Sequence, residues 1–284
     1  MRVVVTGAAG HLGAAIVNEL SGTHDVVALA RPDLDITDRA AVLRRMDALA
    51  PDAIINCAAY NDVDAAQADP LPALELNAFA VASLARAAAA TSAVLVHFGT
   101  DFVFDGEAGH PYVETDAPRP RSFYGLSKLL GERLAADAPR HFVLRVESIF
   151  GGPTAGTTAR DGSLGTIVRK LKAGEAVPVF VDRTVSPSYA PDVASAVRGL
   201  LERRPASGLY HCVNDGHATW DVIAREAATV LGLEPRFTPI AFNSVSLPAP
   251  RPKFCALSSA KLADAGIPMR SWQDALRAWL TPAP

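Results

Sequence analysis

Short apolar runs alternate with longer alanine-rich stretches along the first half of the chain. The runs that predict buried strands are residues 3–5, 26–29, 53–56, 94–98 and 141–145. The stretches that predict helices between them are residues 12–20, 40–49, 72–90 and 123–134. Strands that alternate with helices form βαβ units with right-handed crossovers. The pattern therefore predicts an α/β fold, with a Rossmann-like, doubly wound and mostly parallel sheet.

The pattern changes after Gly151. Residues 151–165 are rich in Gly, Thr and Ala, which predicts a loop. Short predicted helices follow between proline-rich turns, at residues 164–172, 191–203, 219–231 and 272–280. We therefore expect two units, of which the first comprises residues 1–150 and a returning segment, 186–204. The second, a smaller and irregular C-terminal lobe, is expected to comprise residues 151–185 and 205–284.

Composition and charge narrow the class of protein. Apolar residues make up 49% and charged residues 20% of the 284 residues, which is the balance of a soluble globular protein. A net charge of −3 without a basic block argues against nucleic acid or an anionic membrane as a partner. Three scattered cysteines indicate a reducing compartment, and the first strand begins too early for a signal peptide. A cytoplasmic location is expected.

Histidines do not indicate a metal site. Their positions show none of the spacings by which metal ligands are recognised, so we expect no metal ion. His97 lies within an apolar run, where a buried and hydrogen-bonded histidine is expected.

A glycine-rich turn joins the first predicted strand to the first helix, in the segment Thr6-Gly7-Ala8-Ala9-Gly10-His11-Leu12-Gly13. Gly7 permits a tight turn, Gly10 lets the backbone approach a pyrophosphate, and Gly13 lets the helix pack closely on the strand. Backbone N–H groups and the helix dipole at this helix start, around His11 and Leu12, favour phosphate. The segment predicts that residues 1–150 bind a dinucleotide.

The residues after the second and third strands bear on the cofactor. Arg31 stands where an NAD site usually offers a carboxylate, and it could pair with a 2′-phosphate, so NADPH is favoured over NADH. The other interpretation of Arg31 is a solvated loop charge. Asp35 and Ile36 are expected beside the adenine. Small residues at the carboxyl end of the third strand would let the cofactor pass close to the backbone, in the segment Cys57-Ala58-Ala59-Tyr60.

Tyr124 and Lys128 carry the candidate chemistry. On a helix, positions i and i+4 share one face, so the phenol and the ammonium can act on one bound molecule. A nearby cation favours the phenolate, so Lys128 is expected to lower the pKa of Tyr124 toward neutrality. Thr100 ends the preceding strand and could hydrogen-bond the same carbonyl oxygen that Tyr124 protonates. With a nicotinamide, this set can add or remove hydride at a carbonyl.

Together these motifs resemble the extended short-chain dehydrogenase/reductase superfamily, and within it the dTDP-4-dehydrorhamnose reductase family. Nearly the whole chain takes part in the resemblance, through residues 6–13, 34–38, 51–64, 97–106, 112–132, 186–196, 251–252 and 272–276. The segment Thr100-Asp101-Phe102-Val103-Phe104-Asp105-Gly106 is more specific than the glycine turn.

The resemblance implies roles for individual residues. Thr100, Tyr124 and Lys128 would be the catalytic triad, with Tyr124 protonating the C4 keto oxygen and Lys128 holding the nicotinamide ribose. Residues implied in binding the substrate are Val63, Asp64, Thr100, Asp101 and Arg251, the last near its diphosphate. The implied substrate is a nucleotide-activated 4-keto-6-deoxy sugar, dTDP-4-dehydro-L-rhamnose. The expected assembly is a homodimer.

Some positions depart from the family pattern. Where the family commonly has Arg-Thr-Ser-Trp-Val-Tyr-Gly, this chain has Arg145-Val146-Glu147-Ser148-Ile149-Phe150-Gly151, so the sugar pocket loses a tryptophan and gains a charge. Ala65 and Gln67 replace the usual lysine and glutamate, and Gly99 replaces a serine. The catalytic positions are kept, whereas the substrate pocket is altered.

Two alternatives to a reductase remain at this point. One is a dinucleotide-binding regulatory subunit without useful turnover, similar to the methionine adenosyltransferase regulatory subunit, which keeps a Tyr/Lys pair and lacks the tryptophan. The other is a nucleotide-sugar epimerase or dehydratase. Dehydratases need an acidic pair beside the active hydroxyl, and Thr100-Asp101-Phe102 supplies one carboxylate.

Overall fold

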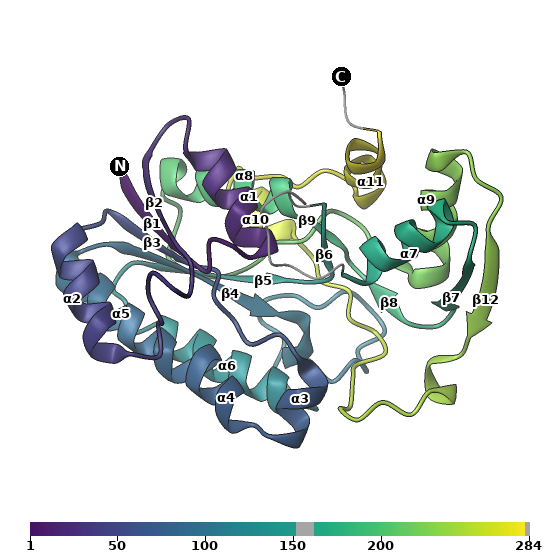
Figure 1. The fold of residues 1–284 in the computed structure, drawn as a ribbon, viewed down its shortest axis with the longest axis horizontal. Helices are drawn as coiled ribbons and strands as arrows, with labels where there is room; N and C mark the ends of the chain where they lie inside the picture. Colours follow the sequence, from purple (N-terminus) through teal and green to yellow (C-terminus); the bar gives the residue numbers. More distant parts are fainter. Residues whose placement is uncertain (152–161, 282–284) are drawn as a thin grey trace.

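A six-stranded parallel sheet forms the centre of the molecule in this computed structural model, which describes residues 1–151 and 162–281 (Figure 1). The strand order is β2-β1-β3-β4-β5-β10. Bounds of the strands in chain order are β1 (Arg2–Thr6), β2 (Asp25–Leu29), β3 (Ala53–Asn56), β4 (Val94–Thr100), β5 (His141–Val146) and β10 (Gly208–His211). The predicted α/β fold with a doubly wound parallel sheet is confirmed.

Helices cover both faces of this sheet (Figure 1). On one face, α1 (His11–Leu20) and α8 (Ala190–Arg203) share a core with the strands. On the other, α2 (Arg39–Leu49), α5 (Ala80–Thr91) and α6 (Phe123–Ala135) do the same. Buried strands such as β3 face apolar side chains on both sides, which is why they appear in the sequence as continuous apolar runs rather than as alternating ones.

The helix expected at residues 72–90 is divided into three parts. It begins as α4 (Leu71–Leu74), passes through the π-helical turn η1 (Glu75–Phe79) and continues as α5. By length and composition the stretch Leu71–Thr91 could cross a membrane, but Val81, Leu84 and Ala85 lie fully buried against the sheet. Such burial is typical of the core helix of a soluble protein.

The C-terminal part has a core of its own, built around Phe150, Val179, Trp220 and Leu276. Its helices at residues 163–172, 220–231 and 272–280 match the predicted ones, whereas α10, η3 and the short strands escaped prediction because two to five residues carry little periodicity. The bounds are β6 (Ile149–Phe150), α7 (Ser163–Lys172), β7 (Ala176–Phe180), β8 (Thr184–Val185), β9 (Ser188–Tyr189), β11 (Ala218–Thr219), α9 (Trp220–Leu231), β12 (Arg236–Ile240), η3 (Phe242–Ser244), α10 (Ala260–Asp264) and α11 (Trp272–Leu280). Most of the loop expected at residues 151–165 lies outside the described residues.

The boundaries expected for the second lobe do not follow the sheet. β10 falls in the range 205–284 given to that lobe, yet it pairs in parallel with β5 as an edge strand of the main sheet. Leu262 and Ile267 also pack in the core shared by α1 and α8. β10 has only four residues, and Leu262 and Ile267 are isolated apolar positions in the sequence. Their place in the main sheet and its core is therefore visible only from the tertiary contacts. The division into two lobes otherwise stays a prediction.

Helix α6 lies unusually close to its neighbours. A Cβ atom added to Gly131 would lie 2.0 Å from the carbonyl oxygen of Asn77 in η1. A Cβ atom on Gly125 would lie 2.3 Å from the carbonyl oxygen of Phe102. Both distances are shorter than any real contact of a methyl group, so the two glycines allow α6 its close approach to η1 and to the turn at Phe102.

We predict that Gly131→Ala destabilises the fold by about 1–3 kcal/mol, because overpacking against a fixed backbone outweighs the helix propensity gained. Gly22→Ala is the matched control, since nothing lies within 4 Å of its added Cβ atom. Urea unfolding of both variants measures the change. Equal stabilities of the two variants would show that α6 can shift without cost.

Candidate active site

The glycine turn meets the end of β3 at the point where the strand order reverses. Gly7 has a φ of 66°, and a Cβ atom there would lie 2.5 Å from the backbone nitrogen of Ala58. A Cβ atom on Gly13 would lie 2.3 Å from the carbonyl oxygen of Gly7. No side chain of the described residues caps α1 at Gly10, and the positive end of the helix dipole lies at this turn. This geometry suits a pyrophosphate at the crevice where doubly wound sheets bind nucleotides.

A buried polar row supports this edge of the sheet. Thr6 and Asn56 end β1 and β3, and His97 lies beside Asn56 in the middle of β4. The Thr6 hydroxyl donates to Oδ1 of Asn56 over 2.8 Å, and Asn56 contacts Nδ1 of His97 over 3.2 Å. Burial, and to a smaller extent the charge of Lys128, lowers the pKa of His97 well below its usual value. His97 is thus buried, hydrogen-bonded and neutral, as expected.

Asn77 fixes the loop that follows β3, a role that no sequence pattern indicated. Its side chain accepts from the backbone nitrogen of Tyr60 over 2.8 Å and donates to the carbonyl oxygen of Tyr60 over 3.0 Å. It also donates to the Ser127 hydroxyl of α6 over 3.0 Å. Cys57 is partly buried at the start of this loop, and burial raises the pKa of its thiol. The π-helical turn that carries Asn77 therefore ties the loop predicted to bind the cofactor to α6.

Arg31 lies in the loop after β2 with 88% of its side chain exposed. Its Nε atom is 3.7 Å from a carboxylate oxygen of Asp35, which is a weak surface pair. Hydrogen bonds from Thr37 lower the pKa of Asp35, so this carboxylate stays ionised. Ile36 is buried in the core beside α2. Ile36 thus anchors the loop in the core, and the exposed Arg31 side chain is accessible to an anion.

Thr100, Tyr124 and Lys128 converge at the carboxyl end of β4. All three are buried, and the Thr100 hydroxyl lies near enough to the Tyr124 phenol to lower its pKa. Tyr124 packs with Val63 and Tyr60, and the Phe102 ring meets it edge to face at 5.5 Å. The three predicted catalytic side chains are therefore brought together.

The expected pKa of Tyr124 is wrong. Burial raises the pKa of its phenol above the usual value, the charge of Asp101 raises it further, and the nearby Thr100 hydroxyl lowers it. Burial lowers the pKa of Lys128 to about 8, against the opposing charge of Glu132. Tyr124 thus holds its proton more firmly than a free tyrosine, because desolvation outweighs its polar neighbours.

A buried ion pair holds α6 against β5. Arg145 donates from Nε and Nη2 to the two carboxylate oxygens of Glu132, over 3.0 and 2.8 Å, and both side chains are at most 6% exposed. The guanidinium also lies 4.9 Å from the centre of the Phe104 ring. A Cβ atom on Gly99 would lie 2.2 Å from a carboxylate oxygen of Glu132. The pair therefore occupies the space beside residue 99, which explains the glycine there.

A second buried group surrounds Asp101. One oxygen of Asp101, one of Glu147 and the sulfur of Cys255 all lie within 4.8 Å of one another. The guanidinium of Arg183 is 3.8 Å from the sulfur of Cys255. The sequence indicated one carboxylate beside Thr100, and the fold supplies a second, because Asp101 and Glu147 follow the neighbouring strands β4 and β5. These residues lie far apart in the sequence, so no motif spacing indicated that they form a group.

Asp64 and Arg251, both predicted to bind the substrate, form a two-pronged ion pair. Arg251 donates to the two carboxylate oxygens of Asp64 over 2.9 and 2.8 Å, which joins α3 (Val63–Ala68) to the C-terminal segment. Arg251 also lines a cavity of about 590 Å³. Three basic side chains line this cavity: Arg121, Arg251 and Lys253.

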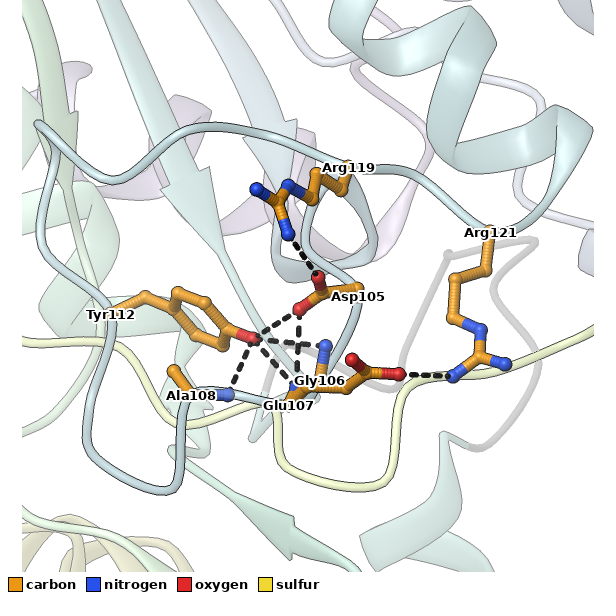
Figure 2. Close-up of polar contacts among 7 residues, drawn as sticks. All are labelled: Asp105, Gly106, Glu107, Ala108, Tyr112, Arg119 and Arg121. Atoms are coloured by element: carbon orange, nitrogen blue, oxygen red, sulfur yellow. Dashed lines mark hydrogen bonds and ion pairs between the residues drawn. The ribbon is translucent and has the colours of Figure 1, made fainter.

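One side of this cavity is a loop, residues 105–108, that hydrogen bonds to the Tyr112 hydroxyl hold in shape (Figure 2). The Tyr112 hydroxyl accepts from the backbone nitrogens of Gly106, Glu107 and Ala108, over 2.9 to 3.2 Å, and donates to Asp105. Arg121 lies 3.5 Å from Glu107 at the cavity, and Arg119 lies 3.7 Å from Asp105. Tyr112 thus fixes the segment that follows the most specific motif.

Comparisons with known proteins agree with this geometry. The family model described as RmlD substrate binding domain matches residues 1–283. A dTDP-4-dehydrorhamnose reductase of Mycobacterium tuberculosis (strain CDC 1551 / Oshkosh) is 37% identical over 97% of this chain and 91% of its own length. A dTDP-4-keto-6-deoxy-D-glucose reductase of Streptomyces niveus is 35% identical over 97% of this chain and 95% of its own length.

A solved structure supports the same assignment. The dTDP-4-dehydrorhamnose reductase of Bacillus anthracis str. Ames, in complex with NADP, has a TM-score of 0.92 at 28% identity, over 99% of both chains. The fold, its glycine turn and its Tyr/Lys helix define an extended short-chain dehydrogenase/reductase. Within that superfamily, the chain belongs to the dTDP-4-dehydrorhamnose reductase family, as the resemblance predicted.

We predict that Glu147→Gln stabilises the protein at neutral pH. Burial and the charge of Asp101 raise the pKa of Glu147 well above its usual value. The folded state therefore binds this proton at pH values where the unfolded chain has released it, and stability falls as the pH rises through that window. Each pH unit within it costs about 1.4 kcal/mol, which a neutral glutamine avoids.

Thermal unfolding from about pH 4 to pH 8 measures this difference, which should grow with pH from near zero. Exposed Glu175→Gln is the control and should change stability by less than about 0.5 kcal/mol. A Glu147→Gln variant that is less stable than the natural protein at neutral pH would contradict the argument.

Proposed function

We propose that the protein reduces the C4 keto group of a nucleotide-activated 4-keto-6-deoxy sugar, converting dTDP-4-dehydro-L-rhamnose to dTDP-L-rhamnose. The observation that carries the proposal is the convergence of Thr100, Tyr124 and Lys128 beside the glycine turn. Relatives along the whole chain that are named as such reductases support it.

Tyr124 is the proposed proton donor, and a reduced nicotinamide in the site supplies the hydride. An alkoxide forming at C4 is a far stronger base than a phenolate, so the transfer is favourable even from a phenol whose pKa is raised. Thr100 orients the carbonyl through its hydroxyl. Lys128, mostly cationic at neutral pH since its pKa is about 8, holds the ribose and stabilises the phenolate that remains.

The residues around the glycine turn fit a dinucleotide. Gly7, Gly10 and Gly13 leave room for a pyrophosphate at the start of α1, where His11 and Leu12 lie. The segment from Cys57 to Tyr60 and the loop of Asp35 and Ile36 border the same edge. Lys128 and Tyr124 would face the nicotinamide end.

We infer a preference for NADPH from Arg31. Its exposed guanidinium has only a weak surface partner, so it is available to a 2′-phosphate. The relative whose structure contains NADP supports this choice.

The sugar nucleotide is proposed to lie between Tyr124 and the cavity at Arg251. Asp64 holds the Arg251 side chain in place at the cavity, and Arg121 and Lys253 add positive charge there for a diphosphate. Val63 packs against Tyr124 and would border the sugar, with Thr100 and Asp101. The relative named as a dTDP-4-keto-6-deoxy-D-glucose reductase makes the epimeric keto sugar the second substrate to test. A cytoplasmic location and the homodimer stay predictions.

We predict that Tyr124→Phe lowers kcat by about 10²- to 10⁴-fold, because it removes the proton donor and keeps the ring packing. The assay follows NADPH absorbance with dTDP-4-dehydro-L-rhamnose, and the 4-keto-6-deoxy-D-glucose nucleotide is offered in parallel. Failure of the natural protein to oxidise NADPH with either sugar, while it binds NADPH, would favour the regulatory alternative.

We predict that Arg31→Ala raises the KM for NADPH by about 10- to 100-fold, the worth of a charge-assisted phosphate contact, and leaves the KM for NADH unchanged. Arg86→Ala, an exposed arginine on α5, is the control. Equal effects on both cofactors would assign Arg31 to the loop's structure instead of to the 2′-phosphate.

A further inference from the structure

A row of three side chains joins Tyr124 to the cavity at Arg251. The Phe102 ring meets the Tyr124 ring edge to face, with their centres 5.5 Å apart. The guanidinium carbon of Arg183 lies 5.8 Å from the centre of the Phe102 ring and 5.7 Å from the centre of the Phe242 ring. Phe242 in turn lines the cavity. The row therefore runs without a break from the proposed proton donor to the proposed diphosphate site.

The row presents surface to a ligand, whereas the acids beside it do not. Phe102, Arg183 and Phe242 are each partly exposed, and Asp101 and Glu147 are buried. Burial raises the pKa of both acids, and the charge of Arg183 lowers it in each. Balancing buried charge is thus one task of Arg183, and it leaves the exposed part of the row available to a substrate.

The segment that carries Arg183 also builds the cavity. A carboxylate oxygen of Asp182 accepts from the backbone nitrogen of Phe242 over 2.7 Å, and the other lies 2.8 Å from Nζ of Lys253. Nη2 of Arg183 lies 3.8 Å from the sulfur of Cys255. Nε of Arg183 is buried without a hydrogen-bond partner among residues 1–151 and 162–281. The flanking rings and the neighbouring Asp182 therefore fix Arg183 relative to the cavity.

The substrate must cross this row. With its diphosphate at Arg251 and its C4 oxygen at Tyr124, a nucleotide sugar has its sugar ring in the stretch between, where the row lies. Ligand sites combine aromatic side chains with a few placed polar groups. Aromatic rings offer an apolar face for the C–H groups of a sugar, and a guanidinium held between rings keeps N–H groups that can donate to hydroxyls.

We propose that the Phe102/Arg183/Phe242 row is the surface on which the sugar ring of the substrate lies, with Arg183 donating to its hydroxyl groups. This inference rests on the proposed reductase function. It gives a role to three residues that neither the motifs nor the resemblance assigned to the site. Arg183 then distinguishes a nucleotide sugar from the nucleotide alone.

The test compares two ligands that differ only in the sugar. Calorimetry with NADP⁺ present measures the Kd of dTDP-L-rhamnose and of dTDP, and the natural protein should bind dTDP-L-rhamnose more tightly. Arg183→Lys keeps the charge that faces the two acids and loses the planar fork. This variant should bind dTDP as the natural protein does, and dTDP-L-rhamnose about 10- to 100-fold more weakly.

A matched control and a second variant accompany this comparison. Arg225, exposed on α9, also lies against a ring, 5.0 Å from the centre of Phe237, and Arg225→Lys should change neither Kd. Phe102→Leu removes one ring of the row without touching Arg183, and should weaken dTDP-L-rhamnose alone by about 2- to 10-fold. Thermal unfolding checks that each variant folds, so that failure of one to fold leaves the other to decide.

Steady-state kinetics give an independent readout. Arg183→Lys should raise the KM for dTDP-4-dehydro-L-rhamnose and leave kcat unchanged, because a contact to the sugar hydroxyls is made before and during the reaction alike. A fall in kcat at unchanged KM would overturn the assignment of Arg183 to substrate binding.

The binding results can also overturn the proposal. An equal loss of affinity for both ligands would assign Arg183 to the shape of the cavity, and unchanged affinity for both would place the sugar elsewhere. So would a natural protein that binds dTDP-L-rhamnose no more tightly than dTDP. Absence of NADPH oxidation by the natural protein would instead overturn the proposed function, and the two Kd values, which need no turnover, would still decide whether the row binds the sugar.

Discussion

The buried ion pair between Glu132 and Arg145 is the interaction on which the site depends. It ties α6, which carries Tyr124 and Lys128, to β5, and it does so inside the protein, where removing one partner would leave an uncompensated charge. Gly131 on the same helix removes the side chain that would hold α6 away from η1. Two features outside the predicted catalytic side chains therefore set the position of the phenol relative to Thr100. They are the buried ion pair and the absence of a side chain at residue 131.

Charge in this site is arranged in two buried groups with different tasks. Glu132 raises the pKa of Lys128 against the effect of burial, so the lysine stays a cation where a phenolate and a ribose would need one. Asp101 and Glu147, balanced by Arg183, instead favour a retained proton on the other side of Thr100. Asp101 is also the charge that acts on the Tyr124 phenol, whose pKa it raises.

The sequence predicted the parts that depend on local patterns. Continuous apolar runs gave the first five strands, and the glycine turn and the Tyr124/Lys128 spacing indicated the site, because both operate over a few residues. The edge strand β10, Asn77 and the pair of Asp101 and Glu147 could not be predicted, since their roles arise from strands and turns that meet only in the fold. The pKa of Tyr124 was wrong for a related reason: spacing indicates a nearby cation but not the degree of burial.

The most direct test of the account is a crystal structure of the Tyr124→Phe variant with NADPH and dTDP-4-dehydro-L-rhamnose. We expect the C4 oxygen of the sugar to lie against the Thr100 hydroxyl and the ring of residue 124, with the nicotinamide on its other side. We also expect the diphosphate at Arg251 and the 2′-phosphate at Arg31. A sugar bound with its C4 oxygen away from Thr100, or turned toward Glu147 in place of residue 124, would contradict it.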